Sequence, residues 1–160
     1  MAIYYGDGSN SGSGREVQVV QTFKNNTAST SGNNFSAISG FTVTITPKSS
    51  SHKILYSGSL YLGGSGTEAV FRLTRSIGGN VVNISKASTF ADDEDGSFCI
   101  GGSSLYRSAS FEFLDSPNTT SAITYGITWQ THAGTIYLNR TWDNGWFHGA
   151  SAITAREIAA

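Results

Sequence analysis

The run Asp92-Asp93-Glu94-Asp95-Gly96 is the densest group of potential metal ligands in the sequence. Calcium takes six to eight oxygen ligands, and carboxylates are suitable donors. The run lacks the alternating D-x-D-x-D-G spacing and the final glutamate of a calcium-binding loop. We therefore expect Asp92–Asp95 to form a solvated acidic loop, with no metal site and no cofactor. The alternative is a calcium ion at a subunit junction, where a neighbouring chain would supply the missing ligands.

The remaining chemistry-bearing residues show no catalytic motif. His52, His132 and His148 are widely separated and form neither an H-x-H nor an H-E-x-x-H motif. There is no G-x-S-x-G nucleophile elbow, and no glycine cluster is followed by the Lys-Ser/Thr pair of a phosphate loop. Because carboxylate pairs for glycan hydrolysis have no fixed sequence spacing, they cannot be tested in this way. We expect a protein that is not an enzyme, with a glycan-degrading enzyme as the remote alternative.

The segment Thr141–Gly149 (TWDNGWFHG) combines three large aromatic residues with histidine, aspartate and asparagine in a predicted turn. Aromatic surfaces with a few polar groups are typical of ligand sites, including sites for sugars. Aromatic residues also mark protein–protein interfaces, so packing against the same domain or a neighbouring subunit is the other interpretation. The residues predicted to contact a ligand are Trp142, Asp143, Asn144, Trp146 and His148.

Composition excludes several classes of partner. Charged residues make up 13% of the 160 residues, against roughly 25% in ordinary soluble domains, and the net charge is −1. No cluster of lysine or arginine provides a footprint for nucleic acid. No apolar run approaches the roughly 20 residues of a membrane-spanning helix. The start of the chain lacks the features of a secretory signal, so we expect neither membrane insertion nor Sec export.

The elements that must position these residues are predicted to be strands. Apolar residues alternate with polar ones at Phe41, Val43 and Ile45 and again from Ile123 to Trp129, as expected for strands with one buried face. Turn signals recur at roughly 8–12 residues. We expect an all-β, jelly-roll-like antiparallel β-sandwich of roughly eight to ten strands with negligible helix. An immunoglobulin-like sandwich and a lipocalin barrel are the alternatives.

The chain divides into a short leading segment and one domain. Residues 1–15 combine an aromatic tag with a Gly/Ser spacer, and residues 16–160 form a single β-sandwich domain. Tyr4 and Tyr5 are predicted to dock into a neighbouring subunit or another protein, or to cover the edge of their own domain.

Three sequence segments resemble the C-terminal domains of tail-fibre and related virion proteins of bacteriophages, especially marine and cyanobacterial ones. They are L-D-S-P-N-T-T-S-x-x-T-Y from Leu114, Y-L-N-R from Tyr137 and I-T-x-x-E-I-A-A from Ile153. The resemblance implies a jelly roll assembled as a homotrimer. It also implies localisation in a phage particle that is assembled in the host cytoplasm, with other virion proteins as partners.

The resemblance also leads to expectations about assembly and function. Ile153, Ala155 and Ile158 of the last strand are expected near the trimer interface, with Arg156 and Glu157 pairing across it. We expect a tail-fibre or tail-spike tip module that attaches the phage to its host, through a surface glycan. The alternative is a capsid decoration protein that stabilises the head.

Overall fold

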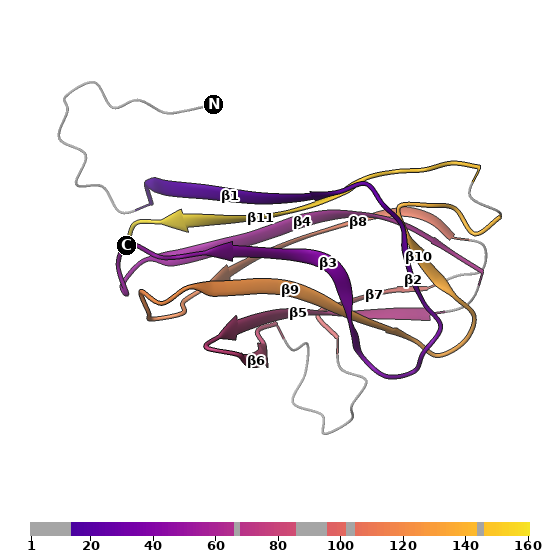
Figure 1. Ribbon diagram of the computed structural model, residues 1–160, viewed down its shortest axis with the longest axis horizontal. Coiled ribbons are helices and arrows are strands. Elements are labelled where there is room, and N and C mark those ends of the chain that lie inside the picture. Colours follow the sequence, from indigo (N-terminus) through magenta and orange to yellow (C-terminus); the bar gives the residue numbers. More distant parts are fainter. Residues whose placement is uncertain (1–13, 66–67, 86–95, 102–104, 144–145) are drawn as a thin grey trace.

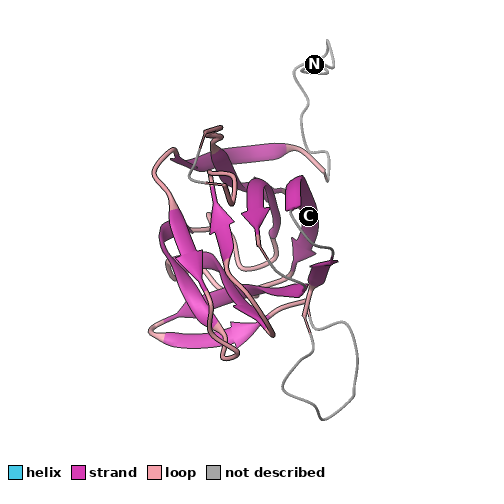
Figure 2. Ribbon diagram, turned by 90° about the vertical axis from the view of Figure 1, so that its right-hand side faces the viewer, coloured by secondary structure: helices cyan, strands magenta, loops and turns pink. Residues whose placement is uncertain are grey.

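The chain folds into two antiparallel β-sheets packed face to face (Figures 1 and 2). The structure is a computed structural model that describes residues 14–65, 68–85, 96–101, 105–143 and 146–160. No helix occurs in these ranges, and so none of the described residues belongs to a helix that could cross a membrane. The predicted all-β sandwich is confirmed.

The first sheet, here called sheet A, has the long strand β4 at its centre. The strand β8 pairs with one side of β4, and β11 and β10 pair with successive parts of the other side. The strands β1 and β2 complete the sheet by pairing with β11 and β10. The strands of sheet A are β1 (Glu16–Lys24), β2 (Ala28–Thr30), β4 (Lys53–Gly64), β8 (Leu105–Asp115), β10 (Ile136–Leu138) and β11 (Ser151–Ile158).

The second sheet, sheet B, follows the order β3, β9, β5, with β6 and β7 both on the far side of β5. Strand pairs within the two sheets are nested along the chain, so that each later pair lies in sequence between the strands of the pair before it. These pairs are β1 with β11, β3 with β9, β4 with β8 and β5 with β7. This rolled-up hairpin pattern is that of a jelly roll. The strands of sheet B are β3 (Ser36–Ile45), β5 (Glu68–Ile77), β6 (Asn80–Asn83), β7 (Phe98–Gly101) and β9 (Ile123–Thr131).

The core lies between the sheets and consists of the alternating apolar residues. Ile123, Tyr125, Ile127 and Trp129 of β9 are all buried, as predicted from their spacing. The Tyr125 ring stacks on Tyr56 of β4 with 5.0 Å between the ring centres, which joins the two sheets. Burial of such rings contributes a large share of the hydrophobic stabilisation of a sandwich.

Two details of the strands do not follow from the sequence pattern. A Gly-Gly pair is typical of a turn, but β4 continues through Gly63 and Gly64. A Cβ at Gly63 would lie 2.3 Å from the carbonyl oxygen of Arg140, so glycine permits a close backbone approach there. The short strands β2 and β7 were not predicted, because neither shows an alternating pattern long enough to read.

Gly78 and Gly79 form the tight hairpin turn between β5 and β6. Both glycines have positive φ, 59° and 87°. Two successive residues with positive φ are the requirement of the tightest hairpin turns, and glycine meets it without steric cost.

The two ends of the sandwich carry different features. The end that holds the C-terminus, here called the terminal end, has Ala159 hydrogen-bonded to Gly14 and Arg15. The opposite end, the loop end, carries the connection from β10 to β11 and the start of β8 (Figure 1). The aromatic segment predicted to contact a ligand lies at the loop end.

Candidate functional site at the loop end

The connection from β10 to β11 begins at a fully buried polar residue, Asn139. Its side-chain amide donates hydrogen bonds to the carbonyl oxygens of Lys24 (2.8 Å) and Asn26 (3.0 Å). Its side-chain oxygen accepts a hydrogen bond from the Ser151 hydroxyl (2.6 Å), which itself accepts one from the Tyr61 N–H. Asn139 also has a φ of 62°, a conformation that asparagine adopts more easily than most residues. Through these bonds, Asn139 holds the end of β10 against the β1–β2 connection, β4 and β11.

Above this anchor, Arg140 and His148 form an isolated antiparallel bridge, and the Thr141 N–H donates to the Phe147 carbonyl oxygen at 3.1 Å. The Gly149 N–H donates to the Asn139 carbonyl oxygen at 3.2 Å. A Cβ at Gly149 would lie 2.3 Å from the Tyr61 ring, so this residue must be small for the segment to close onto β4. The base of the segment is therefore held in place.

The side chains of this segment point to solvent to an unusual degree. Trp142 is 40% exposed, Trp146 80% and Phe147 69%. Single exposed apolar residues are ordinary, but three in a segment of six residues that is fixed at its base form a surface that water solvates poorly. His148 is also exposed. We refer to Trp142, Asp143, Trp146, Phe147 and His148 as the aromatic segment.

A fourth ring comes from β8, far away in the sequence. The Tyr106 side chain lies close enough to Asp143 and Trp142 for both to affect its pKa. The pKa of Tyr106 is raised, first by partial desolvation and then by the neighbouring negative charge of Asp143. Nearby, the Arg140 guanidinium lies over the Tyr137 ring, 4.2 Å from its centre. The site thus offers flat apolar rings beside a carboxylate and a guanidinium.

This arrangement is suited to binding. Rings supply apolar contact with the flat face of a ligand, and the carboxylate and guanidinium supply directed hydrogen bonds. In the described part of the chain, no three His, Cys, Asp or Glu side chains come together as a metal site. The segment lies between β10 and β11, and its role in ligand contact stays a prediction.

Sequence reasoning missed Tyr106 and left Phe147 out of the predicted contact residues. Phe147 adjoins Trp146 and could have been included on composition alone. Tyr106 could not be found in this way, because its proximity to Asp143 depends on the pairing of β8 with β4, which brings Tyr106 opposite Gly63. Three sets of predicted residues, Tyr4 with Tyr5, Asn144, and Asp92–Asp95, lie outside the described residues.

The residues predicted at a trimer interface are divided between two environments. Ile153 and Ala155 are 0% exposed and belong to the core of their own chain, so the prediction of an interface role is wrong for both. Arg156 and Ile158 point to the outer side of sheet A, and their interface role stays a prediction. The physical reason is the alternation of side chains along a strand, which sends neighbouring residues to opposite faces.

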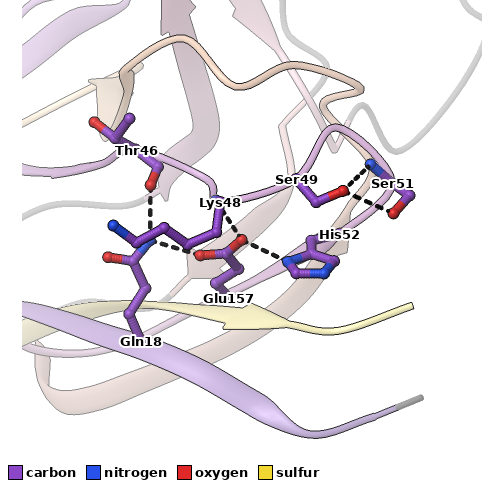
Figure 3. Close-up of polar contacts among 7 residues, drawn as sticks. All are labelled: Gln18, Thr46, Lys48, Ser49, Ser51, His52 and Glu157. Carbon is purple, nitrogen blue, oxygen red and sulfur yellow. Dashed lines mark hydrogen bonds and ion pairs between the residues drawn. The ribbon is translucent and has the colours of Figure 1, made fainter. Parts of the chain in front are cut away.

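Glu157 is also inside the chain and does not pair with Arg156. Its carboxylate accepts hydrogen bonds from the backbone N–H of Lys48 and from the side chains of Gln18 and His52, each at 2.6 Å (Figure 3). Arg156 instead lies 3.6 Å from the carboxylate of Glu16. Burial raises the pKa of Glu157, but the hydrogen bonds from Gln18, His52 and Lys48 together outweigh it, so the pKa lies below its ordinary value.

A third buried polar group joins the sheets near the terminal end. Asp115 at the end of β8 accepts hydrogen bonds from the Arg75 guanidinium at 2.7 and 2.8 Å and from the Tyr125 hydroxyl at 2.7 Å. Asp115, Tyr125, Asn139 and Glu157 all lie in the three segments that resemble phage virion proteins. The residues that carry the resemblance thus build the fold, whereas the aromatic segment lies between two of these segments.

Comparisons with known proteins leave the family open. No family model and no curated protein matches the sequence. Among solved structures, Eiger TNF from S. frugiperda matches with a TM-score of 0.45 and 10% identity, over 91% of this chain and 96% of that one. The structure of infectious bursal disease virus Gx strain matches with a TM-score of 0.47 and 14% identity, over 100% of this chain and 42% of that one.

A third solved structure, TmCBM61 in complex with beta-1,4-galactotriose, has a TM-score of 0.34 and 11% identity, over 84% of this chain and 68% of that one. All three TM-scores lie below 0.5. At this level of likeness the comparisons assign neither a family nor a ligand to the chain.

Proposed function

We propose that this chain is a non-enzymatic virion protein, a trimeric tail-fibre or tail-spike tip module that attaches a phage to a glycan of the host surface. The observation that carries the proposal is the aromatic segment, in which Trp142, Trp146 and Phe147 are 40%, 80% and 69% exposed on a fixed base. Burying so much apolar surface against a ligand would be favourable. The resemblance to phage virion proteins supports the particle as the place of action.

The scaffold supports this use of the segment. Loops held on a stiff β-framework commonly carry recognition, because the framework limits the entropy lost on binding. A trimer would present three copies of the segment, and simultaneous contacts can raise the apparent affinity about 100-fold or more where the geometry permits. The low charge of the chain, 13% of residues, fits a neutral ligand such as a polysaccharide better than a polyanion.

The proposal is tested with purified protein and arrays of lipopolysaccharides and capsular polysaccharides from marine bacteria and cyanobacteria. Tryptophan fluorescence reports on the site directly, because Trp142 and Trp146 are exposed while Trp129 is 2% exposed in the core. We expect at least one glycan to protect the fluorescence from quenching by acrylamide. Absence of both binding and protection across the arrays would contradict the proposal.

The capsid decoration protein is the second candidate, because exposed aromatic residues also serve interfaces between virion subunits. Antibodies against the protein, applied to the phage that encodes it, distinguish the two. Labelling of the tail is expected. Labelling of the head, together with heads that break more easily when the Trp142→Ala/Trp146→Ala variant replaces the protein, would favour decoration.

A further inference from the structure

The connection between β3 and β4, residues 46–52, crosses from sheet B to sheet A at the terminal end (Figure 1). Within it, the His52 N–H donates to the Ser49 carbonyl oxygen and the Ser51 N–H donates to the Ser49 hydroxyl, both at 3.3 Å. These bonds join residues of the connection to each other and do not attach it to a strand. Segments with few bonds to the rest of a domain open at a lower free energy than the strands do. The contacts that attach this connection to the strands therefore decide whether it stays closed.

The attachment is made by the Glu157 carboxylate of β11, which is fully buried (Figure 3). Its Oε1 atom accepts hydrogen bonds from the Lys48 backbone N–H and from Nδ1 of His52, and its Oε2 atom accepts one from the Gln18 side chain, each at 2.6 Å. The same Gln18 nitrogen donates to the Thr46 carbonyl oxygen at 2.7 Å. In the described part of the chain, the hydrogen bonds between residues 46–52 and other elements therefore end on Glu157 or on Gln18.

Adding a proton to Glu157 would break this contact. An ionised carboxylate only accepts hydrogen bonds, so Nδ1 of His52 carries a hydrogen, and it does so whether the imidazole is neutral or charged. A protonated carboxyl group would place an O–H donor among three N–H donors, and it would lose the charge that makes these bonds strong. At least one partner then has to leave. His52 is the partner with the easiest way out, because its side chain is already 19% exposed.

His52 is the titratable side chain that contacts the Glu157 carboxylate. On the neighbouring strands, pairing places Gln18 of β1 and Ile54 of β4 beside Glu157, and neither carries a charge. The pH dependence of the contact is therefore assigned to Glu157 and His52. The other charged residues of these elements and of the connection are exposed or half-exposed: Arg15, Glu16, Lys48, Lys53 and Arg156.

The sign of the pH dependence follows from the environment of Glu157. Burial raises its pKa, but the hydrogen bonds from Gln18, His52 and Lys48, together with the charge of His52, lower the pKa to below 4.5. The closed connection therefore favours the ionised carboxylate. Its stabilisation is fully present above pH 4.5 and is lost as the pH falls through the lower pKa of the closed form.

We propose that the Glu157–His52 contact is a pH switch, which releases the β3–β4 connection in acid while the rest of the sandwich stays folded. The strands keep their backbone ladders, whose N–H and C=O groups do not titrate. At the loop end the buried anchor is the side-chain amide of Asn139, which does not titrate either. Asp115 is the other buried carboxylate of the described residues, and it bonds to the Arg75 guanidinium and not to the connection. The switch thus confines the response to acid to the terminal end and leaves the aromatic segment in place.

Amide hydrogen exchange measured by NMR tests the switch, because it reports on each N–H separately. The Lys48 N–H donates to Glu157, so its protection, corrected for the intrinsic exchange rate at each pH, should fall about tenfold or more between pH 6 and pH 3. The N–H groups of Asn139 and Gly149 donate to carbonyl oxygens at the loop end and should keep their protection within about twofold. The measurement needs no glycan, so its outcome is independent of the proposed function.

Three variants identify the groups responsible. Glu157→Gln should leave Lys48 weakly protected to the same degree at pH 6 and pH 3, because the amide does not titrate. His52→Asn places an amide N–H near the position of Nδ1 and removes the charge of the imidazole, so opening should begin at a higher pH than in the wild type. Glu16→Gln is the matched control: it changes an exposed carboxylate at the same end and should follow the wild type.

The switch is overturned if the protection of Lys48 in the wild type changes by less than about twofold between pH 6 and pH 3. It is also overturned if Lys48, Asn139 and Gly149 lose protection together, since that would be unfolding of the whole sandwich. A Glu157→Gln variant with the wild-type response, or a Glu16→Gln variant without it, would assign the effect to another group. If Glu157→Gln does not fold, the wild-type and His52→Asn measurements decide, and an unchanged opening pH in His52→Asn would contradict the role of His52.

Discussion

Asn139 and Trp146 are seven residues apart in the sequence and lie in opposite environments. Asn139 is 0% exposed and uses its whole side chain in hydrogen bonds within the protein, whereas Trp146 is 80% exposed. The comparison shows that buried hydrogen bonds and exposed aromatic side chains are separated within this connection. The buried polar residue fixes the base, and we expect the aromatic residues above it to contribute little to the fold and to be available for a partner.

The largest loss of stability is expected for a change at Asn139. Asn139→Gly removes hydrogen bonds to Lys24, Asn26 and Ser151 while leaving the positive φ without steric cost. We expect the free energy of unfolding to fall by about 3 kcal/mol or more, because buried groups lose their partners. Urea denaturation followed by circular dichroism measures this.

Asn118→Gly is the matched control for that change. Asn118 also has a positive φ, 52°, but its side chain is exposed. The change should alter the free energy of unfolding by less than about 0.5 kcal/mol. Equal losses at both positions would mean that backbone conformation, and not the buried network, explains the effect at Asn139.

A smaller effect is expected at the terminal end, at Glu157. Because its pKa in the folded state lies below the ordinary value of 4.5, the carboxylate stabilises the fold above that pH, and this stabilisation is lost as the pH falls through the folded-state pKa. Glu157→Gln should lower the free energy of unfolding at pH 7 by about 1–3 kcal/mol. It should also remove this contribution to acid destabilisation.

Unfolding measured in urea from pH 7 down to pH 3 tests the Glu157 prediction. Glu68→Gln, which changes an exposed carboxylate of β5, is the control and should follow the wild type throughout. If the stability of Glu157→Gln depended on pH as the wild type does, the pKa of this carboxylate would be the same in the folded and unfolded states, which would contradict the prediction.

The smallest change in stability is expected for Tyr106→Phe. It removes the hydroxyl, whose pKa Asp143 and Trp142 affect, and keeps the ring. The melting temperature should move by less than about 2 °C, since the group lies at the surface. Trp142 should become more accessible, seen as stronger quenching of fluorescence by acrylamide. Unchanged quenching would show that Tyr106 does not order the aromatic segment.

The strands could be predicted largely from local pattern. The last strand, expected to include Ile153 and Ile158, spans Ser151–Ile158, and the buried positions of β9 follow directly from its alternation. The same alternation should have separated Arg156 from Glu157, because adjacent residues of a strand face opposite sides. The error came from treating the end of the chain as one surface.

The partners of the buried polar residues could not be predicted in this way. Asn139 bonds to Lys24, 115 residues earlier, and Glu157 to Lys48, 109 residues earlier. Local pattern carries no information about such contacts, which depend on how strands from both halves of the chain pair. For the candidate site, composition located the aromatic segment, but the exposure of its rings and the presence of Tyr106 required the structure.

The central claim is that the aromatic segment binds a glycan and contributes little to the stability of the fold. Its most direct test measures glycan binding and melting temperature together for Trp142→Ala/Trp146→Ala. The control is Val81→Ala/Val82→Ala, a double truncation of exposed apolar residues on the β5–β6 hairpin. We predict that the tryptophan variant loses binding at least 100-fold with a melting temperature within about 2 °C of the wild type, and that the control keeps both. Undiminished binding, or a fold that collapses with the tryptophans, would contradict the account.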